Sequence, residues 1–177
     1  SNNSGTTELA HLAGEGMLSK TGSGSLTLNT ATISTIVLQG SGQTDFTGDV
    51  NISEQLSIGN QTVNIQSGAV VTTSRLTASD RGSYVSSTIN INGGALNITG
   101  TVNNANTQNS FFLTHWTHST SVLNLYSGML NAVGAVLNTS WDSRGSFNAI
   151  GGEANLLGIN LSGHEYPDRN GAFTLGS

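Results

Sequence analysis

The sequence predicts an all-β fold, a parallel β-helix (β-solenoid) of about six to seven coils, and three observations carry this prediction. One short pattern is written four times between residues 62 and 161. Apolar and polar residues alternate in short runs such as Leu26-Thr27-Leu28, which indicates strands with one buried and one solvated face. Glycine-rich breaks separate these runs, and glycine provides the left-handed backbone that tight corners need.

The repeated pattern reads VNIQSG at 63–68, ININGG at 89–94, LNLYSG at 123–128 and FNAIGG at 147–152. Its central Asn recurs at positions 64, 90, 124 and 148, in steps of 26, 34 and 24 residues. A second strand follows the glycine in the last three copies. If each strand pairs with its counterpart one coil away, the coils lie about 4.8 Å apart and form a rod about 30 Å tall.

Along the chain, residues 1–13 are expected to form a polar lead and a first irregular element. Within it, residues 8–13 are compatible with either a short helix or an irregular strand. Residues 14–177 are expected to form the coils, as a segment of a longer chain. Further short strands are predicted at 36–38, 50–52 and 56–58, and no ten residues between strands show the 3.6-residue period of a helix.

The composition fits this fold and excludes several classes of protein. Only 8% of the residues are charged and the chain has one proline, whereas disordered chains usually combine high charge with proline. A net charge of −5 with five scattered basic residues argues against nucleic acid as a partner. No apolar run is long enough for membrane insertion by this segment, and the absence of cysteine excludes disulfides and thiolate sites.

Residues 14–28 read GEGMLSKTGSGSLTL, in which the spaced Gly, Leu and Lys positions follow a set order. This stretch resembles the autotransporter-associated β-strand repeat, whose usual form is G-x-L-x-K-x-G-x-G-x-L-x-L. Gly-Gly-x-Leu-Asn-Ile repeats like those at 62–161 are familiar in the same large bacterial surface proteins. The resemblance implies a right-handed parallel β-helix carried in a long exported chain, and it implies no catalytic activity. A cysteine-free chain rich in Asn, Thr and Gly is also typical of a secreted or cell-surface bacterial protein.

The repeated Asn has two interpretations. In the first, which we favour, each Asn is a solvent-facing polar position between two core residues, or the side-chain amides form a ladder of hydrogen bonds up the stack. In the second, they form a row that binds the hydroxyl groups of a sugar.

Candidate functional residues lie in the turn segments that vary between coils, because stacking fixes the strands and leaves the turns free to differ. The arginines of these segments follow the preceding repeat Asn by 17, 20 and 21 residues, which predicts that they share one edge of the rod. Aromatic faces stack on sugar rings, and carboxylates and guanidinium groups bind hydroxyls and acidic sugars. The predicted glycan-contact edge comprises Asp80, Arg81, Tyr84, His115, Trp116, His118, Trp141, Asp142, Arg144, Tyr166, Asp168 and Arg169.

A purely structural interpretation of the same residues is open. Asp and Arg are good turn residues and pair across a turn, and such an exposed pair contributes little to stability. Trp116 and the two phenylalanines can equally cover the stack of coils and bury area where a long loop folds back.

The sequence indicates no enzyme, no metal and no cofactor. Asp80 and Asp142 are the acids expected on one face, but two coils separate them by about 10 Å, which is long for a catalytic carboxylate pair. His115 and His118 are three residues apart but have no third metal ligand. A lyase or hydrolase that degrades polysaccharides is therefore the least favoured of three functions.

The favoured function is a structural and adhesive segment that contacts surface glycans or other cells. The alternative is a self-assembling fibre unit without a ligand. The chain stops at residues 171–177 in a strand fragment, so the rod is expected to continue in a longer chain or to associate end to end.

Overall fold

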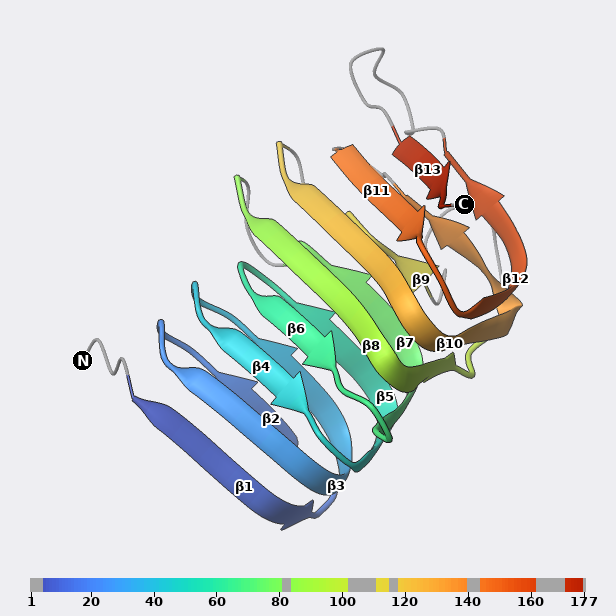
Figure 1. The fold of residues 1–177 in the computed structure, drawn as a ribbon. Coiled ribbons are helices and arrows are strands. Elements are labelled where there is room, and N and C mark those ends of the chain that lie inside the picture. Colours follow the sequence, from blue (N-terminus) through green and yellow to red (C-terminus); the bar gives the residue numbers. More distant parts are fainter. Residues whose placement is uncertain are drawn as a thin grey trace.

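The computed structural model describes residues 5–80, 84–101, 111–114, 118–139, 144–161 and 171–176. The chain coils into a right-handed parallel β-helix of about six turns, built only from strands in its described part (Figure 1). The predicted fold class is therefore confirmed. The strands are β1 (Thr6–Ala13), β2 (Met17–Lys20), β3 (Ser25–Leu38), β4 (Gln43–Phe46), β5 (Asp49–Ile58), β6 (Thr62–Ile65), β7 (Val70–Ala78), β8 (Ser86–Ile98), β9 (Phe111–Phe112), β10 (Thr120–Asn138), β11 (Arg144–Ala149), β12 (Glu153–Asn160) and β13 (Gly171–Leu175).

The pairing of the strands divides each turn of the helix into three short stretches, which stack into three parallel sheets. We name these sheets PB1, PB2 and PB3, in the order in which the chain passes through them. PB1 contains β4, β6, β11, β13 and the first parts of β1, β3, β8 and β10. PB2 contains the following parts of these long strands and the beginnings of β5, β7 and β12. PB3 contains β2, β9 and the ends of β3, β5, β7, β10 and β12. We name the corners T1 (PB1 to PB2), T2 (PB2 to PB3) and T3 (PB3 to PB1).

The first strand is regular. Residues from Thr6, opposite Ser25, to Ala13, opposite Thr32, pair with β3 in parallel. This pairing removes the helix as an alternative for residues 8–13, and it shows that the coils begin ahead of Gly14.

The interior of the helix is a continuous apolar column. Alternation along each short strand turns every second side chain inward, so that Leu28, Phe46 and Ile65 lie above one another in PB1 with no exposed surface. Ile36 and Leu56 form an equivalent column in PB3. Each such buried side chain contributes about 1.5–3 kcal/mol, which makes the core a rigid scaffold for the turns.

The repeated Asn residues form the predicted ladder on the outer side of PB1. Asn90 Nδ2 donates to Asn64 Oδ1 at 2.8 Å, Asn124 donates to Asn90 at 2.9 Å, and Asn148 donates to Asn124 at 2.8 Å. The ladder ends at Asp45, whose carboxylate accepts from Asn64 at 2.8 Å. Because every amide donates in the same direction, a carboxylate that can only accept is a suitable end group. The ladder interpretation is confirmed.

A second ladder runs along the outer side of PB2. Asn155 donates to Asn131 at 3.0 Å, Asn131 donates to Asn97 at 2.9 Å, and Asn97 donates to the Thr72 hydroxyl at 3.3 Å. The two ladders keep neighbouring coils in register on two sheets.

Candidate ligand-contact edge at the T3 turns

Four residues of the predicted glycan-contact edge lie within the described part of the chain, and all four belong to T3 or border it. They are Asp80, Tyr84, His118 and Arg144. The other predicted residues lie outside the described residues: Arg81, His115, Trp116, Trp141, Asp142, Tyr166, Asp168 and Arg169.

The strand register places three of the four described residues along one line parallel to the helix axis. Thr120 pairs with Ser86 on one side and with Arg144 on the other, where PB1 begins. Tyr84 and His118 precede Ser86 and Thr120 by two residues each. The structure therefore brings Tyr84, His118 and Arg144 to the same edge of three successive coils.

Tyr84 and His118 form an exposed ring stack. Their ring centroids are 4.9 Å apart and their planes differ by 17°, so one ring lies above the other at the spacing of the coils. Tyr84 keeps 77% of its surface exposed, and His118 is also exposed. The stack therefore stands on the outside of the rod rather than in its core.

The backbone beneath the stack has an uncommon conformation. Tyr84 has φ 63° and His118 has φ 59°, and Ser79 at the start of the same turn as Tyr84 has φ 49°. Among the described residues, these three are the non-glycine residues with positive φ. A bulky side chain in this left-handed region is a rare outlier that costs of order 1–3 kcal/mol, and surrounding contacts must hold it there.

Buried serine hydroxyls supply these contacts. Ser79 Oγ lies 2.6 Å from Ser121 Oγ and 3.0 Å from Ser87 Oγ, and Ser87 and Ser121 are 2.9 Å apart. Ser79 also receives support through its backbone N–H, which donates to Ser87 Oγ at 3.1 Å. All three serines are at most 2% exposed, so this cluster fixes T3 from the inside.

Two further hydrogen bonds fix the residues that follow the stacked rings. The Val85 N–H donates to Ser119 Oγ at 3.4 Å, which links the neighbours of Tyr84 and His118. The Ser86 N–H donates to Asn60 Oδ1 at 3.3 Å, from the preceding T3 turn.

Asp80 and Arg144 contribute opposite charges at different positions. Asp80 is half-buried, and its Oδ2 accepts from the Ser57 hydroxyl at 2.7 Å. Arg144 is the exposed first residue of β11, and its backbone N–H donates to the Ser119 carbonyl at 3.1 Å. In the part of the chain that the structure describes, no group of three or more His, Asp or Glu side chains is arranged to hold a metal ion.

The serine cluster and Asn60 were not predicted from the sequence, although a signal exists. Tyr84 and His118 each stand six residues before a repeat Asn, at 90 and 124, and Ser87 and Ser121 each stand three residues before it. Counting back from the following Asn aligns these pairs, because the length of T3 varies. The arginines were aligned by counting forward from the preceding Asn. That count includes the T3 turn, whose length varies, so it does not align Tyr84 with His118.

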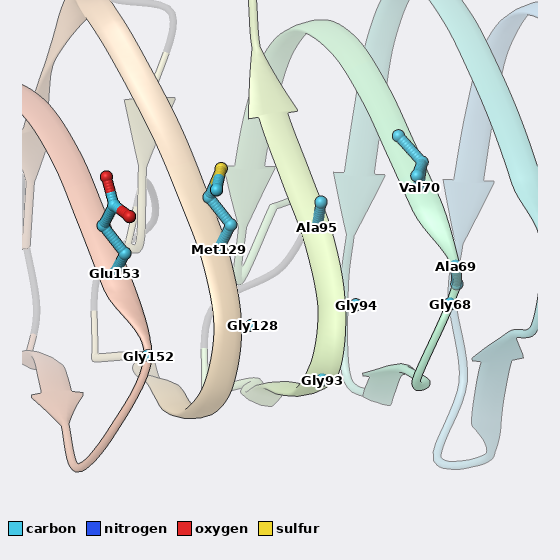
Figure 2. Close-up of a pocket in the computed structure, with 10 residues that line it drawn as sticks. All are labelled: Gly68, Ala69, Val70, Gly93, Gly94, Ala95, Gly128, Met129, Gly152 and Glu153. Atoms are coloured by element: carbon cyan, nitrogen blue, oxygen red, sulfur yellow. The ribbon is translucent and has the colours of Figure 1, made fainter.

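The T1 corner carries a groove of about 590 Å³ along the axis (Figure 2). Its floor is formed by glycines, including Gly93 and Gly128, and the side chains of Val70, Met129 and Glu153 stand beside it. The Glu153 carboxylate accepts from Asn155 Nδ2 at 2.8 Å. The groove thus follows from the close stacking of small residues, and T3 remains the candidate site.

Comparisons of the chain with protein families, with curated proteins and with solved structures gave no match. The class of the protein therefore rests on the fold, which is a right-handed parallel β-helix with an exposed aromatic stack on one edge. None of the described residues forms a helix of the length and apolarity needed to cross a membrane.

Proposed function

We propose that the chain is a structural and adhesive segment of a secreted or surface-displayed bacterial protein, and that its T3 edge contacts glycans on surfaces or other cells. The resemblance of residues 14–28 to the autotransporter-associated repeat supports the location. The stacked apolar core and the two Asn ladders support the structural part. The proposal assigns no catalytic step, metal or cofactor to the edge.

The observation that carries the adhesive part is the Tyr84–His118 stack. Tyr84 is a bulky residue in a left-handed backbone conformation that glycine or asparagine adopts at lower cost, His118 shares this conformation, and both side chains face solvent. Neither ring adds to the core. Retaining strained residues at the surface is typical of binding sites, where the side chain is needed for a contact with a ligand.

Binding to a glycan array tests this function. We expect the wild-type chain to bind a subset of glycans, and the double variant Tyr84→Asn/His118→Asn to lose most of that signal. Asn tolerates positive φ, so this variant removes the rings without adding backbone strain. A second double variant, Trp116→Ala/Trp141→Ala, tests the predicted tryptophans of the same edge. Absence of binding by the wild-type chain would reject the glycan-contact function.

A second candidate, a fibre unit without a ligand, is favoured by the Asn ladders. Such ladders stabilise stacks of identical strands irrespective of any ligand. Electron microscopy of the purified chain across a range of concentrations distinguishes the two functions. Filaments together with a blank array would select the fibre unit, and discrete particles that bind glycans would select the adhesive segment.

A further inference from the structure

The two faces of the Tyr84 ring are not equivalent. His118 lies one coil further along the axis, in the direction of the C-terminus, and covers one face at 4.9 Å. Tyr84 nevertheless keeps 77% of its surface exposed. A ring with both faces covered does not retain that exposure, so the face directed toward the N-terminal coils is free.

The free face lies on the side of a shorter T3 turn, and we call this change in turn length the step. On the N-terminal side, the T3 turn between β5 and β6 contains only residues 59–61. The T3 turn that carries Tyr84 spans residues 79–85, between β7 and β8. Asn60 lies in the shorter turn and is exposed, and it meets the longer turn at Ser86, two residues after Tyr84.

Asn60 presents a fixed polar group at this step. Its Oδ1 accepts the Ser86 N–H at 3.3 Å, which sets the orientation of the amide beside the start of β8. Its Nδ2 makes no hydrogen bond within the described part of the chain, so both of its N–H groups can donate to a ligand. An aromatic face and an oriented amide donor are therefore held at the same edge of two successive coils, on either side of Val85 and Ser86.

We infer that this step binds one pyranose ring, whose C–H face lies on the free face of Tyr84 and whose hydroxyl group accepts a hydrogen bond from Asn60 Nδ2. The ligand class follows from the pairing of an aromatic face with a neutral amide donor. A nucleotide would stack on the same ring, but its phosphates meet a chain of net charge −5 with Asp80 in the same turn. This inference rests on the proposed glycan-contact function and restricts it to a single sugar at Tyr84.

The geometry also limits the length of the contact. Because Tyr84 and His118 stack on each other along the axis, the faces between them are not available to a sugar. A glycan chain that runs along the edge therefore finds one free tyrosine face rather than a row of faces.

NMR titration of the wild-type chain with methyl β-D-galactopyranoside and methyl β-D-glucopyranoside tests the inference. Galactose has a continuous C–H patch on one face, so we expect it to bind more tightly, with the largest shifts around Tyr84 and Asn60. Tyr84→Phe keeps the ring and is expected to change Kd by less than about twofold. Tyr84→Asn removes the ring and is expected to weaken binding at least about fivefold.

Asn60→Asp is the matched test of the amide. Aspartate keeps the oxygen that accepts the Ser86 N–H and replaces the donor by an acceptor, so we expect binding to weaken about threefold or more. Unfolding curves of Tyr84→Asn and Asn60→Asp check that both variants fold.

The outcomes separate this inference from the function on which it rests. If the array shows glycan binding but Tyr84→Asn binds like the wild type, the sugar site at Tyr84 is rejected and the glycan-contact edge stands. If the array is positive but neither monosaccharide binds, the restriction to a single ring is rejected. If no glycan binds the wild-type chain at all, both the edge and the sugar site are rejected.

Discussion

T1 and T3 both contain residues with positive φ, but the later T3 turns use other residue types than T1 does. In T1, Gly68, Gly93, Gly128 and Gly152 have φ between 79° and 89°. In T3, the early turns also place glycine there, with Gly22 at φ 88° and Gly40 at φ 92°, whereas the later turns place Ser79, Tyr84 and His118 at φ between 49° and 63°. The same conformational requirement is thus met by glycine, without strain, in T1 and in the early T3 turns, and with strain in the later T3 turns that carry Tyr84 and His118.

Close packing explains the glycines of T1. A Cβ on Gly128 would collide with the carbonyl oxygen of Gly94 in the neighbouring coil, and one on Gly94 would lie 2.7 Å from Ile65 Cγ2. No side chain fits at these two positions, so the stacking of the coils requires glycine there. At Tyr84 and His118, by contrast, the later T3 turns hold exposed side chains, and neither ring belongs to the core. The difference indicates that stacking determines the residues of T1, whereas the later T3 turns can present side chains to a ligand.

The largest expected effect lies in T1. Gly128→Ala adds both backbone strain at φ 89° and a collision with backbone of the next coil, so we expect a loss of about 3 kcal/mol or more in the free energy of unfolding. Gly68→Ala has φ 81° but no atom within 4 Å of the new Cβ, and should cost about 1 kcal/mol. Urea unfolding measures both.

Gly158→Ala is the control for these variants. It lies in β12 outside the left-handed region, and its new Cβ would meet only Val136 Cγ2 at 3.8 Å. We expect a change within about 0.5 kcal/mol. If Gly128→Ala is as mild as this control, close packing does not explain the glycines of T1.

Breaking the PB1 ladder should have the next largest effect. Asn90→Ala leaves Asn64 Oδ1 without its donor and Asn124 Nδ2 without its acceptor in a partly buried setting. We expect a loss of about 2 kcal/mol in urea unfolding. Asn51→Ala is the matched control, because the Asn51 side chain also faces outward from a strand but is exposed and makes no hydrogen bond with the described residues. Equal losses in the two variants would show that the ladder adds nothing.

The first coil carries a charge where later coils are apolar. Lys20 occupies the inward position that Leu38 and Ile58 fill in the next coils, and its Nζ is buried without a hydrogen-bond partner. Burial lowers the pKa of Lys20 below its ordinary value of 10.5. We therefore expect Lys20→Met to raise stability at pH 7, by about 1 kcal/mol.

The pH dependence of this gain has a definite sign. With a lower pKa in the folded state, protonated Lys20 destabilises the fold, fully below the lowered pKa and less as the pH rises from the lowered pKa toward 10.5. The advantage of Lys20→Met should shrink over that range in unfolding curves. Ser19→Ala, at the neighbouring residue, should show no such trend, and a constant difference for Lys20→Met would contradict the role of the charge.

The fold could be predicted because its determinants recur in the sequence. Inward residues such as Leu26 and Leu28 alternate with polar ones, and the repeat Asn marks each coil, so both the strands and the ladder follow from local pattern. The T3 site could be predicted only as a set of residue types. The stack of Tyr84 on His118 depends on the register between turns of unequal length. The serine cluster forms because three serine side chains point inward at a corner, and the alternation of apolar and polar residues does not predict side-chain direction there.

The smallest effect on stability is expected for Tyr84→Asn in T3, and its contrast with Gly128→Ala in T1 distinguishes the two corners. Tyr84→Asn relieves strain of order 1 kcal/mol and loses a ring stack worth about 0.5–1.5 kcal/mol, so we expect the free energy of unfolding to change by less than about 1 kcal/mol. Tyr84→Phe keeps both the strain and the stack and should match the wild type. A loss above about 2 kcal/mol for Tyr84→Asn would mean that the ring stabilises T3 as packing stabilises T1. The strained rings would then need no ligand to explain them.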